Sequence, residues 1–237
     1  MVATEASPRT FWLLMRNLKL NGARNVRAVN VAVSDRAARL DLFEVSKGNI
    51  GTVTTLPTRG GKRVNAIDAL PLERILTADE IRRLRLIKID VEGAERQIMQ
   101  SLIDKLTMYP PDMDIIVGVS PDEDYDAWKG IFRRLQSAGF AAFEIENFYD
   151  VAWYLGWKLP APFKRVSDMP KRQEDLLFTR AHSSPDSSRG YERGSFPVRA
   201  NLASKDRGNV FPNAACVTAP IDRLTHHAKI LALTGES

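Results

Sequence analysis

The sequence predicts an α/β domain with a largely parallel sheet over residues 1–180 of the 237-residue chain. Strand-like and helix-like segments alternate along this stretch, which is typical of parallel strands joined by right-handed helical crossovers. The runs "LRLIKID" (84–90) and "MDIIVGVS" (113–120) are apolar almost throughout, like strands buried on both faces. Beyond residue 180 the alternation stops and Ser, Gly, Arg and Asn become frequent, so residues 181–237 are predicted to be a disordered tail.

The helices are predicted from apolar residues that recur every three to four positions and from residues that suit helix ends. In the first helix Ser7 is an N-cap candidate, and Asn21 with Gly22 tolerates the left-handed conformation of a helix C-terminus. The stretch "TADE" (77–80) fits a capping box, in which the Thr and Glu side chains satisfy each other's backbone amides. The predicted helices are 8–20, a short one that opens at 77–80, one after Gly93, 124–139 and a weak one at 221–233.

The strands are predicted from alternating apolar and polar residues and from a composition rich in Val, Ile and Phe. The predicted strands are 25–35, 38–45, 84–90, 113–120, 140–147 and 175–180. Between the second and the third of them, the Gly- and Thr-rich stretch 46–64 predicts mostly loop. The aromatic run 147–163 precedes the last strand. Its Tyr and Trp side chains either stack on a bound sugar or a flat ligand or pack against the sheet.

The composition excludes several kinds of site and partner. The histidines, His182, His226 and His227, all lie in the predicted tail, which argues against a Ser-His-Asp triad or a His-ligated metal in the folded part. A single cysteine, Cys216, excludes an internal disulfide and a multi-cysteine zinc site. The net charge of +5 is spread along the chain, so no nucleic-acid partner is expected. No apolar run approaches the ~20 residues that cross a bilayer. Without such a run or a signal-peptide pattern, we expect no membrane association and a cytoplasmic location.

Polar residues stand where the predicted strands end. In doubly wound sheets, ligands bind outside the carboxyl ends of the strands. A carboxylate at such an end suits the two ribose hydroxyls of a nucleoside, and a neighbouring Asp suits an adenine amino group, so an adenosine-bearing cofactor is predicted. The candidate residues are Glu5, Ser34, Asp35, Asp90 and Ser120.

Several of these stretches together resemble a known family. The stretch "LIKIDVEGAE" (86–95), preceded by "VNAIDAL" (64–70) and "NVRAVNVAVSDRAARLDLF" (25–43), resembles the FkbM-type methyltransferases. The stretch "KGNIGTVTTL" (47–56) resembles the Gly-Asn-x-Gly segment of that family, and residues 2–22 resemble its second strand and the helix that follows. The resemblance implies a Rossmann-like class I methyltransferase sheet with helices on both faces. It also implies S-adenosyl-L-methionine as the methyl donor and a hydroxyl of a small molecule or sugar as the acceptor.

The resemblance implies roles for individual residues. Glu5 would bind the ribose, and Asp90 would lie beside the methionine part of the cofactor and the transferred methyl group. Glu92 would face the acceptor or hydrogen-bond the loop, and either Asp90 or Glu92 would remove the acceptor's proton. Gly93 permits the sharp turn from strand to helix. A structural role is favoured for Glu95, because the helix macrodipole stabilises an acid in the first turn.

Two departures from the family pattern affect these expectations. The family's Gly-rich loop would lie before residue 1, so the sheet is expected to lack its first strand and helix and to expose the edges of the neighbouring strands. Gly118 stands where the family usually shows an acid. These departures keep open a second hypothesis, a non-catalytic truncated remnant of such an enzyme. A Rossmann domain for a nucleotide sugar or NAD is a weaker third, because no strand leads into the glycines of "TRGGKRVN" (58–65).

Overall fold

The computed structural model describes residues 1–44, 53–55, 57, 61–91, 93–121, 124–145, 164–180 and 230–234. The aromatic run and residues 181–229 and 235–237 of the predicted tail lie outside these residues, so the boundary at residue 180 stays a prediction. The prediction of disorder is wrong at 230–234, because these residues form a strand of the larger sheet. Within the described part of the chain, no helix is long and apolar enough to cross a membrane.

The larger of two sheets has eight strands in the order β10-β9-β11-β8-β7-β12-β1-β2. Its strands are β1 (Val2–Thr4), β2 (Arg27–Val29), β7 (Leu84–Ile89), β8 (Asp114–Val119), β9 (Ala141–Ile145), β10 (Lys164–Val166), β11 (Glu174–Thr179) and β12 (Ile230–Thr234). β1 runs parallel to β2 and β7 runs parallel to β8, whereas β10, β11 and β12 run antiparallel to their neighbours. The α/β prediction is confirmed, and the sheet is mixed rather than largely parallel.

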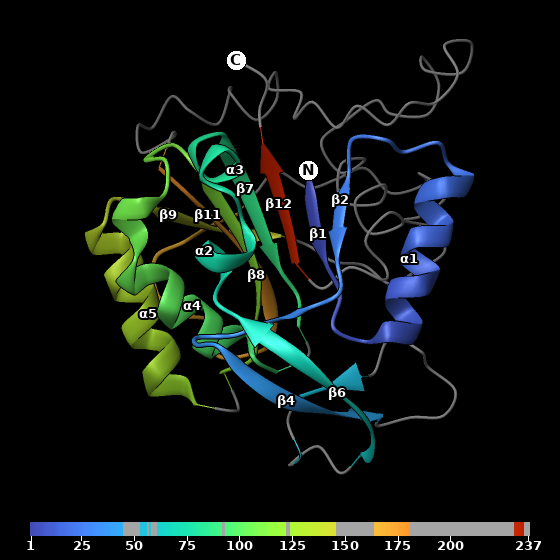
Figure 1. Cartoon of the computed structure of the whole chain (residues 1–237). Coiled ribbons are helices and arrows are strands. Elements are labelled where there is room, and N and C mark those ends of the chain that lie inside the picture. Colours follow the sequence, from blue (N-terminus) through green and yellow to red (C-terminus); the bar gives the residue numbers. More distant parts are fainter. Residues whose placement is uncertain are drawn as a thin grey trace, which may run out of the picture.

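An inner strand of this sheet, β12, comes from the far end of the chain and lies between β7 and β1 (Figure 1). Ala232 of β12 lies opposite Val2 of β1 on one side and Ile87 of β7 on the other, and both pairings are antiparallel. These edges of β1 and β7 are therefore paired, and the expectation that they would be exposed is wrong. The weak helix predicted over 221–233 is also wrong at its end, because residues 230–233 belong to β12.

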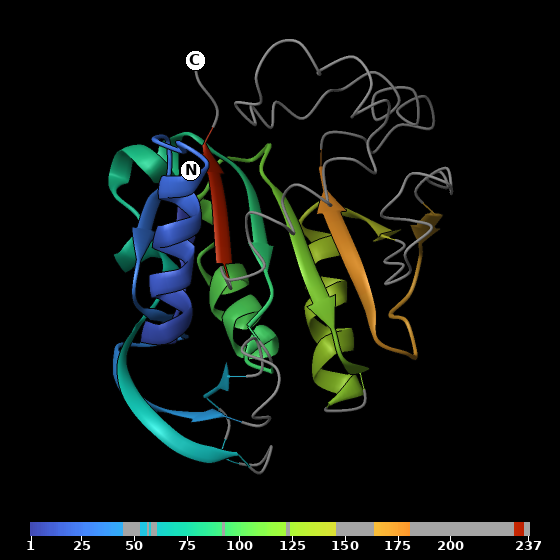
Figure 2. The same ribbon diagram turned by 90° about the vertical axis from the view of Figure 1, so that its right-hand side faces the viewer.

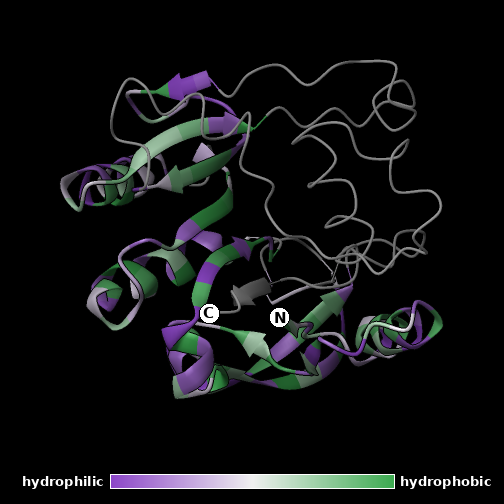
Figure 3. Cartoon of the chain, turned by 90° about the horizontal axis from the view of Figure 1, so that it is seen from above, coloured by the Kyte–Doolittle hydropathy of each residue, from purple (hydrophilic) through white to green (hydrophobic). Residues whose placement is uncertain are grey.

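Helices cover both faces of the larger sheet, as Figures 2 and 3 show. On one face lies α1 (Pro8–Leu20), whose buried Leu14 and Leu18 pack with Ala3 of β1. On the other face lie α4 (Glu95–Asp104) and α5 (Tyr125–Ser137), in a core that also contains Val2. Val2 and Ala3 are adjacent in a strand, so their side chains point to opposite faces. The prediction of helices on both faces is confirmed.

A smaller sheet of four strands lies across the end of the larger sheet toward which β1 and β7 run (Figure 1). Its strands, in the order β3-β6-β4-β5, are β3 (Ala32–Val33), β4 (Ala38–Glu44), β5 (Val53–Thr54) and β6 (Lys62–Leu70). β5 and the start of β6 fall in the stretch predicted as loop, so that prediction is wrong at 53–54 and 62–64. The smaller sheet covers the carboxyl edge of the larger one, where ligands of α/β sheets bind.

The predicted strand 25–35 is divided between the two sheets. β2 ends at Val29 in the larger sheet, and β3 begins at Ala32 in the smaller one. At the bend, the Asn30 side-chain amide donates hydrogen bonds to the carbonyl oxygens of Glu5 and Ala6, at 2.8 and 3.1 Å. Asn30 therefore joins the end of β2 to the turn that follows β1.

The helix-end predictions are confirmed where the structure describes them. Ser7 Oγ accepts the Thr10 N–H at 3.3 Å at the start of α1, and Gly22 beyond its end has a φ of 63°. The capping box at Thr77 and Glu80 opens α3 (Ala78–Arg82) with both of its hydrogen bonds present. The short α2 (Leu72–Ile75) and the 3-10 turn Leu106–Met108 were not predicted.

Candidate active site

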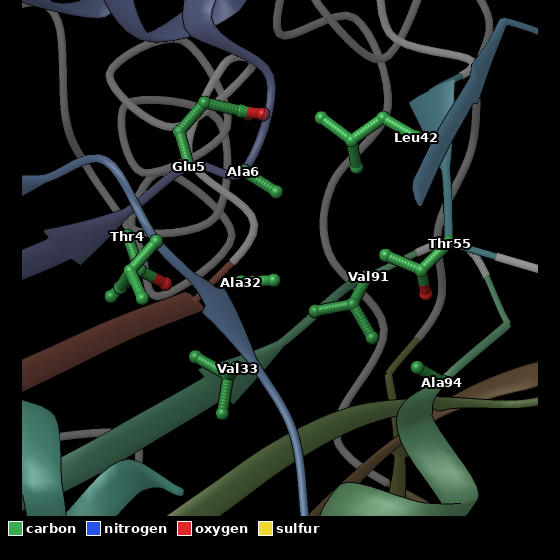
Figure 4. Close-up of a pocket in the computed structure, with 10 residues that line it drawn as sticks. Thr4, Glu5, Ala6, Ala32, Val33, Leu42, Thr55, Val91 and Ala94 are labelled. Atoms are coloured by element: carbon green, nitrogen blue, oxygen red, sulfur yellow. The ribbon is translucent and has the colours of Figure 1, made fainter. Parts of the chain in front are cut away.

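A small pocket lies where the ends of β1 and β7 meet the smaller sheet. Its lining residues are Thr4, Glu5, Ala6, Val31, Ala32, Val33, Leu42, Thr55, Val91 and Ala94. In Figure 4, Glu5 and Ala32 lie on one side of it, and Leu42 of β4 and Thr55, which follows β5, lie on the other. The cavity volume is about 30 Å³, which is room for about two or three water molecules and less than a nucleoside occupies.

Glu5 is a buried carboxylate at the carboxyl end of β1, with 1% of its surface exposed. Its N–H donates to the Val29 carbonyl at 3.1 Å, and its own carbonyl accepts the bond from Asn30. Its Oε1 accepts the Ser7 N–H at 2.7 Å, just before α1 begins. A buried carboxylate needs hydrogen-bond donors, and here the turn between strand and helix supplies one of them. These contacts fix both the backbone and the side chain of Glu5 at the pocket.

The turn between β7 and α4 carries the second group of candidate residues. Asp90 directly follows β7; its side chain is 57% exposed, and Lys88 Nζ lies 3.8 Å from its Oδ2. Gly93 has a φ of 110°, which confirms the reason predicted for a glycine there. Glu95 is buried and turns back toward the turn: its Oε1 accepts the Val91 N–H at 2.9 Å and its Oε2 accepts the Gly93 N–H at 2.8 Å. Burial raises the pKa of Glu95 above its ordinary value of 4.5, and hydrogen bonds from backbone amides oppose this rise.

The structure brings together only part of the predicted site. Glu5 and the turn after Asp90 share the pocket, because Val91 lines it beside Glu5. Ser34 and Asp35 directly follow β3, whose Val33 lines the pocket, but neither of them lines it, and neither does Asp90. Ser34 Oγ donates to Asp35 Oδ1 at 3.0 Å, and Asp35 is exposed. Glu92 lies outside the described residues. The roles of all these residues stay predictions.

Sequence reasoning missed a carboxylate at the same end of the larger sheet. Asp175 of β11 lies directly opposite Gly118 of β8. Ile89 lies opposite Val117, so Asp90 is level with Gly118 by the same register. A Cβ at Gly118 would lie 3.3 Å from Asp175 Oδ1. The neighbouring strand therefore places a carboxylate next to the position where the family usually shows an acid, and no local pattern reveals it, since strand register is a tertiary property.

The chemistry of these residues fits an adenosyl cofactor with a positively charged sulfur. The carboxylate of Glu5 suits ribose hydroxyls, and the apolar side chains of Val31, Val33 and Ala94 suit a purine ring. Asp90 adds a negative charge at the turn, which favours a nearby cation. Among the described residues, no group of three or more His, Cys, Asp or Glu side chains is placed to hold a metal ion.

A family model described as "Methyltransferase FkbM domain" matches residues 1–142, which include Glu5 and the turn after β7. No curated protein matches the chain. Among solved structures, the chain is similar to the crystal structure of precorrin-6y C5,15-methyltransferase from Geobacter metallireducens GS-15. The identity is 12% and the TM-score is 0.33, over 75% of this chain and 67% of that one.

Proposed function

The chain belongs to the FkbM methyltransferase domain family, and from this premise we propose that it methylates a hydroxyl group of a small molecule or a glycan with S-adenosyl-L-methionine. One observation carries the proposal: the buried Glu5 at the end of β1 and the turn that carries Asp90 after β7 meet at one pocket. That pocket lies at the carboxyl edge of the sheet, where cofactors of this fold class bind.

Glu5, Val31 and Val33 form the proposed nucleoside side of the site. The Glu5 carboxylate accepts the ribose hydroxyls, and its fixed backbone lowers the entropic cost of ordering it. The two valines, with Ala32 between them, form the apolar wall next to the adenine. The cavity is smaller than a nucleoside, so the proposal requires the pocket to widen when the cofactor binds.

Asp90 is the proposed proton acceptor in the methyl-transfer reaction. When bound, the cofactor supplies a methyl group already activated by a positively charged sulfur. The protein then has to orient the acceptor in line and to accept one proton. The exposed carboxylate of Asp90 accepts the hydroxyl proton as the oxygen–methyl bond forms and the sulfur–methyl bond breaks. Asp175, beside Gly118 at the same end of the sheet, offers a second carboxylate for orienting the acceptor hydroxyl.

The cofactor proposal is tested by calorimetric titration of S-adenosylhomocysteine into the full chain and into Glu5→Gln. The wild-type chain is expected to bind, and the variant to bind about tenfold more weakly, because a neutral amide replaces a charged acceptor of hydrogen bonds. Glu73→Gln is the matched control, since Glu73 pairs with Lys105 at 2.5 Å and does not line the pocket. Urea unfolding of all three proteins checks that each is folded. An absence of binding by the folded wild-type chain would overturn the proposal.

The acceptor is tested with a cofactor that carries an isotopic label in the methyl group. The chain is incubated with alcohols and sugars and, separately, with amine analogues of the same compounds. Label on the hydroxyl compounds alone is expected. Label on the amines alone would contradict the proposed acceptor and leave the methyltransferase assignment intact.

One observation favours the alternative, a member of the family that does not catalyse. β12 is antiparallel to β1 and β7, so its first residue, Ile230, lies opposite Thr4 and Ile89 at the carboxyl edge of those strands. In the family, by resemblance, a glycine-rich loop follows the end of the first strand and approaches the methionine part of the cofactor. A strand that runs the opposite way does not present its carboxyl end there. Failure of the folded chain to bind S-adenosylhomocysteine would favour this alternative.

A further inference from the structure

Glu95 contacts the turn that carries the candidate catalytic residues. Stabilising the N-terminus of α4 does not by itself explain this contact. We propose that Glu95 is a positioning residue for methyl transfer, which holds the backbone between β7 and α4 at two points by accepting hydrogen bonds from the amides of Val91 and Gly93. The proposal rests on the proposed function and adds to it the group that holds the turn in place.

The geometry of Glu95 is that of a carboxylate that joins two points of one turn. Oε1 accepts from the Val91 amide at 2.9 Å, and Oε2 accepts from the Gly93 amide at 2.8 Å. These two amides flank position 92, and the first of them directly follows Asp90. One side chain therefore fixes the backbone on both sides of Glu92 and next to Asp90.

Glu95 is buried, so its hydrogen bonds must offset the free-energy cost of removing a carboxylate from water. The residue is 9% exposed, and taking a carboxylate out of water is unfavourable unless hydrogen bonds replace the lost solvation. The nearby charge of Asp90 adds to the cost, and both effects raise the pKa of Glu95. A surface carboxylate in the first turn would gain the same favourable helix dipole without being buried. The dipole alone therefore does not account for the placement of Glu95.

The helix N-terminus gives a second indication of this role. Ala94 is the N-cap of α4 and has no side chain that could accept a hydrogen bond from the first helical amides. Glu95, the first residue of the helix, directs its carboxylate back to the amides of Val91 and Gly93, and its own backbone amide is a further donor. The side chain thus orders the residues before the helix, which are those that approach the pocket.

The contact reaches the pocket through two lining residues. Val91 and Ala94 both line it, and they lie at the two ends of the segment that Glu95 holds. A shift of this segment would move one wall of the pocket and the carboxylate of Asp90 together. Displacements of about 1 Å at a reacting group cost on the order of a hundredfold in rate, so an ordered turn has a direct value for catalysis.

The test compares the wild-type chain with Glu95→Gln and with the control Glu73→Gln. A glutamine side chain has one oxygen, so it can accept from only one of the two amides, and its NH₂ group faces the other. Hydrogen exchange of the Val91 and Gly93 amides is measured together with binding of S-adenosylhomocysteine. In Glu95→Gln at least one of the two amides is expected to exchange about tenfold faster, and the affinity to fall about tenfold. In Glu95→Gln, exchange of the Met99 amide in α4 should stay unchanged. In Glu73→Gln, exchange of the Val91, Gly93 and Met99 amides should all stay unchanged.

The outcomes separate the two proposals. Selective loss of protection at the turn together with weaker binding supports the positioning role. If Glu95→Gln binds like the wild type, or if protection falls throughout α4 as much as at the turn, the residue is an ordinary structural acid and the inference is overturned. If the folded wild-type chain itself does not bind, the proposed function fails and the positioning role fails with it. The exchange data then show independently whether Glu95 orders the turn.

Discussion

Asp90 and Asp35 show how the fold assigns different surroundings to the same side chain. Both follow a segment with strand character, and both were predicted to bind the cofactor. Neither side chain lines the pocket: Asp90 lies between β7 and the pocket-lining Val91, whereas Asp35 lies two residues beyond the pocket-lining Val33 and its carboxylate is 3.5 Å from the Arg36 guanidinium. At the residue scale, the pocket therefore favours Asp90 over Asp35 as a ligand of the cofactor.

This difference predicts a charge-specific effect of Asp90→Asn. The variant should bind S-adenosylmethionine about fivefold more weakly, since a nearby charge pair in a water-like surrounding contributes about 1 kcal/mol. It should bind S-adenosylhomocysteine, whose sulfur is neutral, with little change. Asp35→Asn is the matched control and should change neither affinity by more than about twofold. Calorimetry with both ligands measures the effect, and an equal loss for the two ligands would contradict it.

At the scale of elements, Glu80 connects α3 to the larger sheet. The capping box uses its Oε2, which accepts the Thr77 N–H at 2.8 Å. The same carboxylate accepts two bonds from Arg27 of β2, from Nε at 2.8 Å and from Nη2 at 2.6 Å. Arg27 Nη2 also donates to the Ile75 carbonyl at 2.9 Å, at the end of α2. One local capping motif thus becomes a contact between elements that are 53 residues apart.

The Glu80 contact predicts a specific loss of stability in acid. Hydrogen bonds from Arg27 lower the pKa of Glu80 from 4.5 to about 2. Because the folded-state pKa is lowered, the ionised carboxylate stabilises the fold above pH 4.5, and this contribution is lost as the pH falls toward 2. Glu80→Gln, which keeps a capping-box residue, should lower the free energy of unfolding at pH 7 by about 1 kcal/mol. Between pH 4.5 and 2, the free energy of unfolding of this variant should also decline less steeply than that of the wild type.

Asp79→Asn is the control for this change. Asp79 precedes Glu80 in the same helix and pairs with the exposed Arg82 and Arg83 at the end of that helix. Its substitution should cost less than about 0.5 kcal/mol. Urea unfolding between pH 7 and 2 measures both variants, and equal acid profiles for Glu80→Gln and the wild type would show that the Arg27 contact contributes nothing.

At the scale of the whole molecule, the larger sheet depends on its last strand. β12 pairs with five residues of β7 and three of β1, so it joins the β1–β2 pair to the rest of the sheet. Without it, two inner strands would present unpaired N–H and C=O groups, which invite association with other chains. The N-terminal helix and strands would then be held to the remainder chiefly through the smaller sheet and the Arg27 contact.

A chain that ends at residue 229 is therefore expected to be less stable and to associate. The free energy of unfolding should fall by at least about 3 kcal/mol, because several backbone hydrogen bonds and their packing are lost. A chain that ends at Thr234 keeps β12 and serves as the control. A full-length Ala232→Pro variant removes one backbone N–H from the strand pairing. Its free energy of unfolding should lie between those of the two shortened chains. Urea unfolding and light scattering measure these effects, and equal stability of the chains ending at 229 and 234 would contradict a structural role for β12.

Much of the local structure could be predicted because it depends on neighbouring residues. Ser7 and Gly22 bound α1, and Thr77 with Glu80 opens α3, through contacts that span only a few positions. The apolar stripe of α5 follows from the 3.6-residue period, and its members Trp128, Ile131, Phe132 and Leu135 are all buried. The end of β7 also follows from composition, so Asp90 could be predicted at the edge of the sheet.

By itself, then, the sequence determined the α/β class, the helix ends, the strand that leads to Asp90 and the family resemblance. Only the tertiary structure decided that β12 lies between β1 and β7, that residues 25–35 divide at Asn30 between two sheets, and that Asp175 lies beside Gly118. It also decided that Glu95 turns back to the amides of Val91 and Gly93. The physical reason is the range of the interactions. Helix caps and periodicity act over a few residues, whereas strand pairing joins residues far apart in the chain, and a one-residue slip in register would turn every side chain to the other face.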